Sequence, residues 1–299
     1  MKISHLDDSF FSRLETLALN LRNNLTGYFG GKHLVSTYGQ TVEFSDFREY
    51  QLGDDIRRID WNLYSRFEKY YLKLFTDERQ MQVQLFLDCS ASMGKEIPQK
   101  GAYAVAAAAA LGYLAVHNMD KVSFHLMKET VSENPFGTII GKNAFFRAIS
   151  SLSEMTFDGE TDIEKCVVSC PSTGSSNGLS VIISDFFTDS DWKKAVDYLC
   201  YKHRQVLLVQ VLSPEDVDPS YDGRVSMIDS EAVDLSDSRN MKIKITRSMQ
   251  KAYEEAYRDF TQDIRSFCSK RGVDYISVRT DSPIERVLFG EMLKVGIMS

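Results

Sequence analysis

The pattern of apolar and polar positions becomes regular from residue 81 onward. Short apolar runs rich in β-forming residues alternate there with longer segments of helical periodicity. Strands are predicted near 82–88, 121–127, 179–185, 205–212 and 273–278. Helices are predicted at about 99–117, 142–153, 162–169, 190–202, 247–271 and 283–294. This alternation indicates an α/β fold with a mostly parallel sheet and helices on both faces.

Two segments depart from that alternation. Residues 8–25 carry apolar side chains at three- and four-residue spacings, which predicts an amphipathic helix. Residues 214–245 contain prolines and a glycine followed by two β-like runs, 224–229 and 231–235, which predict an inserted β-hairpin. We therefore expect a first part, 1–80, packed on a main α/β domain, 81–299.

The strand predicted at 82–88 ends on a group of oxygen-bearing side chains. Asp88 is followed at two-residue intervals by Ser90 and Ser92. In open α/β sheets, ligands bind beyond the carboxyl ends of the strands, and Mg²⁺ prefers oxygen ligands. The same residues also commonly cap a following helix, so this segment alone does not decide between a metal site and a cap.

Two later segments supply further ligands of the same kind. Thr161 lies in a glycine-marked loop, and Asp185 ends the strand predicted at 179–185. Loops at one edge of a parallel sheet converge, although they are far apart in the sequence. The sequence therefore predicts an oxygen-only Mg²⁺ or Mn²⁺ site made by Asp88, Ser90, Ser92, Thr161 and Asp185.

This set is similar to the metal-ion-dependent adhesion site of von Willebrand factor A domains. That site has the pattern Asp-x-Ser-x-Ser, a later Thr and a still later Asp, and all five positions are filled here. The resemblance implies a von Willebrand factor A-like fold. It also implies that Ser90 and Ser92 bind the ion directly, and that an acidic residue of a partner completes the coordination.

Net charge, cysteine content and the absence of recognisable targeting segments limit the classes of protein to which this chain can belong. The chain has 299 residues and a net charge of −7, which argues against general nucleic-acid binding. Its five cysteines are widely spread and read as reduced thiols. We recognise neither an export signal nor a transmembrane segment, so we expect a cytoplasmic protein.

A charged segment precedes the sheet. Residues 43–79 contain nine acids and seven bases with aromatic side chains between them. Such residues form either an ion-pair network that fixes this segment to the main domain or a surface that binds a partner. The sequence leaves both roles open for Arg48, Glu49, Asp54, Asp55, Arg57, Asp60 and Trp61.

The same segment carries a second resemblance. The string Gly-Asp-Asp-x-Arg-x-Ile-Asp-Trp at residues 53–61 is similar to domain-of-unknown-function family fifty-eight (DUF58), as is the chain from about residue 30 onward. That family joins such a segment to a von Willebrand factor A-like domain. The resemblance implies cooperation with a MoxR-type AAA+ ATPase, as an adaptor or assembly factor.

Three functions remain in competition. The first is a non-enzymatic, metal-dependent protein-binding adaptor. The second is a Mg²⁺-dependent phosphohydrolase of the haloacid-dehalogenase type, whose chemistry needs an acid two residues after the nucleophilic Asp, where this chain has Ser90. The third is a scaffold with a vestigial metal site. The complete five-residue set favours the adaptor.

Overall fold

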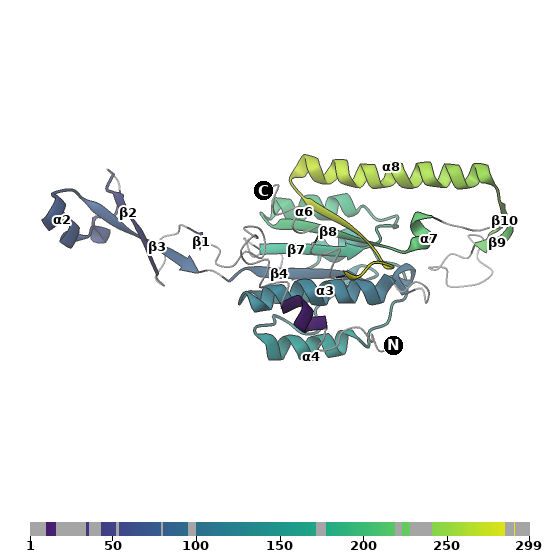
Figure 1. Ribbon diagram of the computed structural model, residues 1–299, viewed down its shortest axis with the longest axis horizontal. Helices are drawn as coiled ribbons and strands as arrows, with labels where there is room; N and C mark the ends of the chain where they lie inside the picture. Colours follow the sequence, from purple (N-terminus) through teal and green to yellow (C-terminus); the bar gives the residue numbers. More distant parts are fainter. Residues whose placement is uncertain are drawn as a thin grey trace. The chain divides into compact units, whose positions relative to one another are not determined.

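The computed structural model describes residues 10–15, 34–35, 43–51, 54–78, 80–94, 100–171, 178–218, 223–227, 241–284 and 290 (Figure 1). The chain divides into two compact units, one formed by residues 1–29 and 81–299 and the other by residues 30–80. The helical residues 10–15 thus group with the sheet unit. The predicted grouping of residues 1–80 as one part packed on the main domain stays a prediction.

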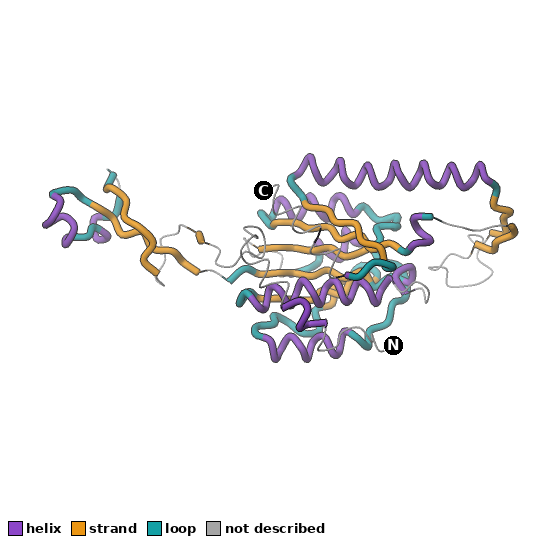
Figure 2. Tube along the Cα trace, in the orientation of Figure 1, coloured by secondary structure: helices purple, strands orange, loops and turns teal. Residues whose placement is uncertain are grey.

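A six-stranded sheet forms the centre of the larger unit, with strand order β11-β8-β7-β4-β5-β6. Neighbouring strands are parallel except β6, which is antiparallel to β5. Figure 2 shows these strands between helices. The sheet consists of β4 (Gln82–Asp88), β5 (Lys121–Lys128), β6 (Val131–Glu133), β7 (Gly178–Ser184), β8 (Gln205–Leu212) and β11 (Asp274–Arg279). The predicted α/β class is confirmed.

Helices cover both faces of this sheet because its strands are apolar on both sides. Leu85 and Leu87 belong to one buried cluster with residues of α3, α4 and the helical segment 10–15. Phe86, which points to the opposite face, belongs to a second cluster with residues of α5, α6 and α8. The five helices are α3 (Lys100–His117), α4 (Lys142–Leu152), α5 (Ile163–Val168), α6 (Trp192–Tyr201) and α8 (Arg247–Arg271).

Helix α3 is the alanine-rich run of the sequence, and small residues let it pack closely. A Cβ atom added at Gly112 would lie 2.9 Å from Cε2 of Phe145, a side chain of α4. Across the described ranges, no helix is both long enough and apolar enough to cross a lipid bilayer.

The five strands predicted for the sheet, and the five helices predicted between 99 and 271, agree with the observed bounds to within about two residues. The inserted hairpin within 214–245 is present: β9 (Gly223–Met227), close to the predicted run 224–229, pairs antiparallel with β10 (Met241–Ile245). The run 231–235, predicted as its second strand, lies outside the described residues, as do 283–294 apart from residues 283, 284 and 290, and most of 8–25. The strand at 241–245 was missed, although its alternation of apolar residues with lysine is typical of a strand.

The unit formed by residues 30–80 is a small antiparallel sheet with order β1-β3-β2. The register of β2 shifts between Phe44 and Asp46, which marks a β-bulge. Its elements are β1 (Leu34–Val35), β2 (Glu43–Glu49), the 3₁₀ turn η1 (Ile56–Arg58), α2 (Trp61–Phe67) and β3 (Tyr71–Glu78).

Candidate metal centre

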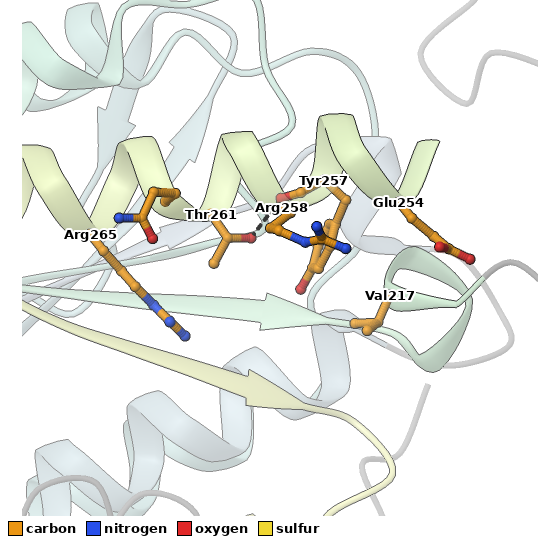
Figure 3. A pocket seen from close by; sticks show the side chains of 7 residues that line it. Val217, Glu254, Tyr257, Arg258, Thr261 and Arg265 are labelled. Atoms are coloured by element: carbon orange, nitrogen blue, oxygen red, sulfur yellow. Dashed lines mark hydrogen bonds between the residues drawn. The ribbon is translucent and has the colours of Figure 1, made fainter. Parts of the chain in front are cut away.

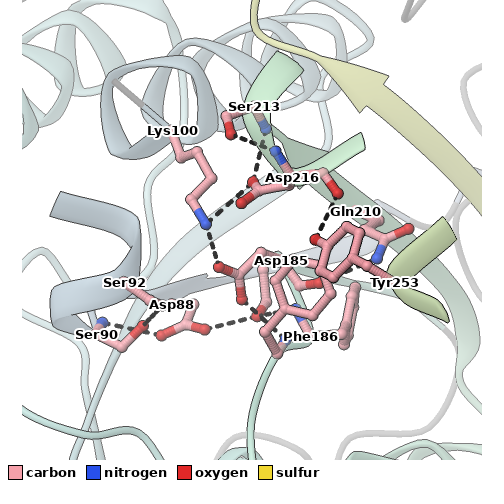
Figure 4. Close-up of polar contacts among 12 residues, drawn as sticks. Asp88, Ser90, Ser92, Lys100, Asp185, Phe186, Gln210, Ser213, Asp216 and Tyr253 are labelled. Carbon is pink, nitrogen blue, oxygen red and sulfur yellow. Dashed lines mark hydrogen bonds and ion pairs between the residues drawn. The ribbon is translucent and has the colours of Figure 1, made fainter. Parts of the chain in front are cut away.

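The carboxyl ends of β4 and β7 bring two predicted site segments side by side. Asp88 is the last residue of β4, and Asp185 directly follows β7. Because the two strands are parallel neighbours, Ser184 of β7 donates a 2.6 Å hydrogen bond to Oδ2 of Asp88. Figure 4 shows Asp88 and Asp185 near each other. The backbone N–H of Ser90 donates to Oδ1 of the same carboxyl group at 2.9 Å.

The loop after β4 gathers the two predicted serine ligands. A 3₁₀ turn, η2 (Ala91–Gly94), curls this loop and places the hydroxyl oxygens of Ser90 and Ser92 3.0 Å apart. Backbone hydrogen bonds from Ala91 N to Gly159 O and from Asp158 N to Cys89 O, each 2.9 Å, hold the loop against the segment that leads to Thr161.

A residue of β5, Met127, connects Thr161 to the same loop. Met127 pairs with Asp88 in the parallel register of β5 and β4. Its carbonyl oxygen accepts hydrogen bonds from Cys89 N at 3.2 Å and from the Thr161 hydroxyl at 3.3 Å. The structure therefore places Thr161 beside the Asp88 loop and joins it to that loop through Met127.

Asp185 is the most buried of the five predicted ligands. Its Oδ1 atom accepts the backbone N–H of Phe187 at 3.0 Å, and its carbonyl oxygen accepts the side-chain amide of Gln210 at 3.0 Å. Its Oδ2 atom lies 2.5 Å from Nζ of Lys100, the first residue of α3. The carboxylate predicted to serve a metal thus also carries an ion pair with a lysine.

Lys100 contacts a second carboxylate. Its Nζ atom also faces Asp216 (Figure 4), at 3.3 Å from Oδ2. Only 4% of the Lys100 side chain is exposed. Burial lowers the pKa of the Lys100 amine, but the charges and hydrogen bonds of Asp185 and Asp216 outweigh burial, and the pKa is raised. The ammonium group therefore stays charged in this site.

Asp216 is itself held firmly by local structure. It belongs to α7 (Pro214–Val217), where Ser213 and Asp216 form a reciprocal capping box. The Ser213 N–H donates to Oδ2 of Asp216 at 2.8 Å. The hydroxyl of Tyr253, a residue of α8, donates to the carbonyl oxygen of Asp216 at 2.8 Å.

The electrostatics of Asp88 reflect its depth. Burial is the main cause that raises the pKa of the Asp88 carboxyl, and the neighbouring charge of Asp185 raises it further. Hydrogen bonds from Ser184 and Ser90 oppose this effect without cancelling it. The side chains of Asp88, Ser90, Thr161 and Asp185 are buried.

The chemistry of this donor set fits Mg²⁺ or Mn²⁺. All five side chains offer oxygen, the ligand atom that these hard cations prefer. Three carboxyl groups, those of Asp88, Asp185 and Asp216, lie in this cluster against the one ammonium of Lys100, so a divalent ion would meet more acidic than basic side chains. Nowhere in the described ranges do three His, Cys, Asp or Glu side chains form a metal-binding group, so a metal here needs the serine and threonine hydroxyls.

A separate groove of about 360 Å³ runs along α8 (Figure 3). It contains none of the five predicted metal ligands, although Val217 in its wall directly follows Asp216. Its lining is Val217, Glu254, Tyr257, Arg258, Thr261, Gln262 and Arg265.

The charged segment of the small unit combines ion pairs with helix caps. Arg48 pairs with Asp54 at 2.8 Å, and the Arg48 guanidinium is the main cause that lowers the pKa of Asp54. Glu49 pairs with Lys69 at 3.1 Å.

The remaining residues of that segment have local or exposed positions. Asp55 caps η1 through Arg57 N, and Asp60 caps α2 through the N–H groups of Asn62 and Leu63. Arg57 is exposed, as is 60% of Trp61, whose ring packs edge-on against Tyr64 and Tyr70. Whether this segment also binds a partner stays a prediction.

Sequence reasoning missed three residues of the centre: Ser184, Lys100 and Asp216. A signal existed for each. Ser184 directly precedes a predicted ligand, Lys100 is a lone charge at the start of an apolar helix, and Asp216 closes a Ser-x-x-Asp capping pattern. The sequence does not show, however, which residue each of these three side chains contacts.

Comparison with known proteins identifies relatives of this chain. Uncharacterized proteins of Mycobacterium bovis and Mycobacterium tuberculosis are 26% identical over 280 residues, which cover 92% of this chain and 86% of theirs.

Among solved structures, the conserved hypothetical protein BatB from Bacteroides thetaiotaomicron is 14% identical, with a TM-score of 0.43. The match covers 73% of this chain and 99% of that one. A von Willebrand factor type A protein from Catenulispora acidiphila is 12% identical, with a TM-score of 0.33 and coverage of 46% and 35%. The model of the family described as "Protein of unknown function DUF58" matches residues 46–263, and the chain therefore belongs to that family.

Proposed function

We propose that this protein is a non-enzymatic, metal-dependent binding module. Asp88, Ser90, Ser92, Thr161 and Asp185 would hold one Mg²⁺ or Mn²⁺ ion. When bound, the ion supplies a hard positive centre with a coordination position that an acidic side chain of a partner fills. The observation that carries the proposal is the set of oxygen-bearing side chains at the carboxyl ends of β4 and β7.

The chain's own residues have separate tasks in this proposal. The hydroxyls of Ser90 and Ser92 are neutral ligands, so they would leave much of the ion's charge for the partner. Ser184 and the Ser90 amide orient the Asp88 carboxyl group. The partner that we propose is a MoxR-type AAA+ ATPase or its client, in the cytoplasm.

The phosphohydrolase alternative gains no support from the described residues. Both carboxyl oxygens of Asp88 accept hydrogen bonds, and its side chain is buried, which is a poor state for a nucleophile. The position two residues further holds Ser90, which is no general acid. The scaffold alternative predicts the same contacts without an ion, and only an experiment separates it from the binding module.

The test is capture of the MoxR-type ATPase on the immobilised protein, with Mg²⁺ and with chelator. We expect capture to require Mg²⁺ and to fail for Ser92→Ala and Thr161→Ala. Thr161→Ser, which keeps the hydroxyl, should retain capture, as should the surface control Ser151→Ala, whose side chain is exposed on α4. Capture that persists undiminished in chelator would remove the metal from the interaction.

A further inference from the structure

Lys100 occupies an unusual position for a lysine. Its ammonium group lies 2.5 Å from Asp185 and 3.3 Å from Asp216, and 5.7 Å from the ring centroid of Phe187. The side chain is 4% exposed and that of Asp185 2%. A charge buried to this degree requires a partner of opposite sign, and here it has two.

One of these two partners is also a proposed ligand of the divalent ion. An ammonium and a divalent cation repel each other strongly in a poorly solvated site. We therefore expect that the two cations do not both contact the Asp185 carboxylate. The second carboxylate offers the ammonium an alternative position. Asp216 is held in place by its capping box with Ser213 and is not among the proposed metal ligands.

We propose that Lys100 is an internal counter-ion that competes with the divalent ion for Asp185. The ammonium neutralises Asp185 in their ion pair, so a divalent ion that takes Asp185 as a ligand has to displace it. When the ion binds, the ammonium shifts its pairing to Asp216. Lys100 thereby lowers the affinity for the metal, and Asp216 partly restores it. The inference rests on the proposed function, because it needs a metal at Asp185.

The experiment is calorimetric titration of the full chain with Mn²⁺ for the wild type, Lys100→Met and Asp216→Asn. We expect Lys100→Met to bind at least about tenfold more tightly and Asp216→Asn about three- to tenfold more weakly. Lys121→Met is the matched control for general charge. Lys121 begins β5, at the end of the strand opposite the candidate metal centre, where it pairs with Gln82 of β4. Its affinity should stay within about twofold of the wild type.

The possible outcomes distinguish failure of the competition from failure of the proposed metal site. If the wild type binds and Lys100→Met has the same affinity, the competition is refuted while the metal site stands. If only Lys100→Met binds, the competition is supported and the wild type is no metal-dependent binder. If neither binds, both proposals fail. Should circular dichroism show Lys100→Met to be unfolded, unchanged affinity in Asp216→Asn refutes the inference.

Discussion

The hydroxyl of Ser184 donates a 2.6 Å hydrogen bond to Oδ2 of Asp88, and this bond joins the carboxyl ends of two neighbouring parallel strands. Ser184 also accepts the backbone N–H of Phe186 at 2.9 Å. The Asp88 carboxyl is thus oriented from the side of β7, while the Ser90 amide orients it from its own loop. Ionisation of Asp88 therefore places a negative charge in a buried position, and this affects the free energy of unfolding.

We predict that Asp88→Asn stabilises the metal-free protein at neutral pH. The folded-state pKa of Asp88 is raised above its ordinary value of 3.8, chiefly by burial, so the folded state favours the proton. The contribution of Asp88 to stability is therefore present below pH 3.8 and is lost as the pH rises through the raised pKa. The Oδ1 atom of an asparagine can still accept the Ser90 N–H, and its amide Nδ2 can donate to the Ser184 hydroxyl, both without the charge.

Urea denaturation in chelator at a series of pH values measures this effect. The difference between Asp88→Asn and the wild type should grow in favour of the variant as the pH rises, and the variant should lose any stabilisation by Mg²⁺. A difference that changes with pH in the opposite direction would contradict the prediction.

The Asp60→Ala substitution should destabilise α2 by about 1 kcal/mol, the usual effect of losing an N-cap. This value is smaller than the 3–5 kcal/mol typical of a broken buried ion pair, which the charged segment first suggested. The reason is that the Asp60 carboxylate accepts the N–H groups of Asn62 and Leu63.

Amide hydrogen exchange tests this cap directly, because Asn62 and Leu63 should lose protection. The neighbouring substitution Trp61→Ser is the control. Its side chain is 60% exposed, so unfolding free energy should change by less than about 1 kcal/mol. Unaltered protection of both amides in Asp60→Ala would show that the cap is unimportant.

His125 should make the fold sensitive to acid. Burial, followed by the charge of Arg204, lowers the pKa of His125 to about 4 from 6.5. The unfolded chain thus binds a proton that the folded chain rejects, and stability falls as the pH drops from 6.5 to about 4. At about 1.4 kcal/mol per pH unit, the loss amounts to roughly 3 kcal/mol.

The His125→Gln substitution should remove that part of the pH dependence, whereas His117→Gln at a more exposed position should leave it in place. Unfolding free energies measured between pH 7 and pH 4 make the comparison. An equally steep loss of stability in His125→Gln would assign the acid sensitivity to other groups.

The Gly178→Ala substitution should destabilise the sheet by about 1–3 kcal/mol, as overpacking does. A Cβ atom there would overlap the carbonyl oxygen of Gln82 and lie 2.8 Å from Nη1 of Arg204. Gln82 is the register partner of Gly178 across β4 and β7. Gly290→Ala, where an added Cβ atom meets no described residue within 4 Å, is the matched control. Equal melting temperatures for the two variants would argue against close contact at Gly178.

The sequence by itself determined the α/β class, because the alternation of buried strands with helices depends on local periodicity. It also located the oxygen-bearing loops, since Asp88 and Asp185 stand where predicted strands end. The roles of the charged residues in the unit formed by residues 30–80 were harder to predict from the sequence. Its residues Asp55 and Asp60 follow the general preference for acids at helix caps, but the sequence suggested ion pairs as strongly.

Only the tertiary structure decided what surrounds the candidate metal ligands. Lys100 and Asp185 are 85 residues apart, and Ser184 and Asp88 are 96 apart, so no local pattern pairs them. Burial of the site was equally hidden, because exposure depends on how loops from distant strands pack together. The ion pair between Lys100 and Asp185 exists because the order of strands in the sheet brings the start of α3 to the end of β7.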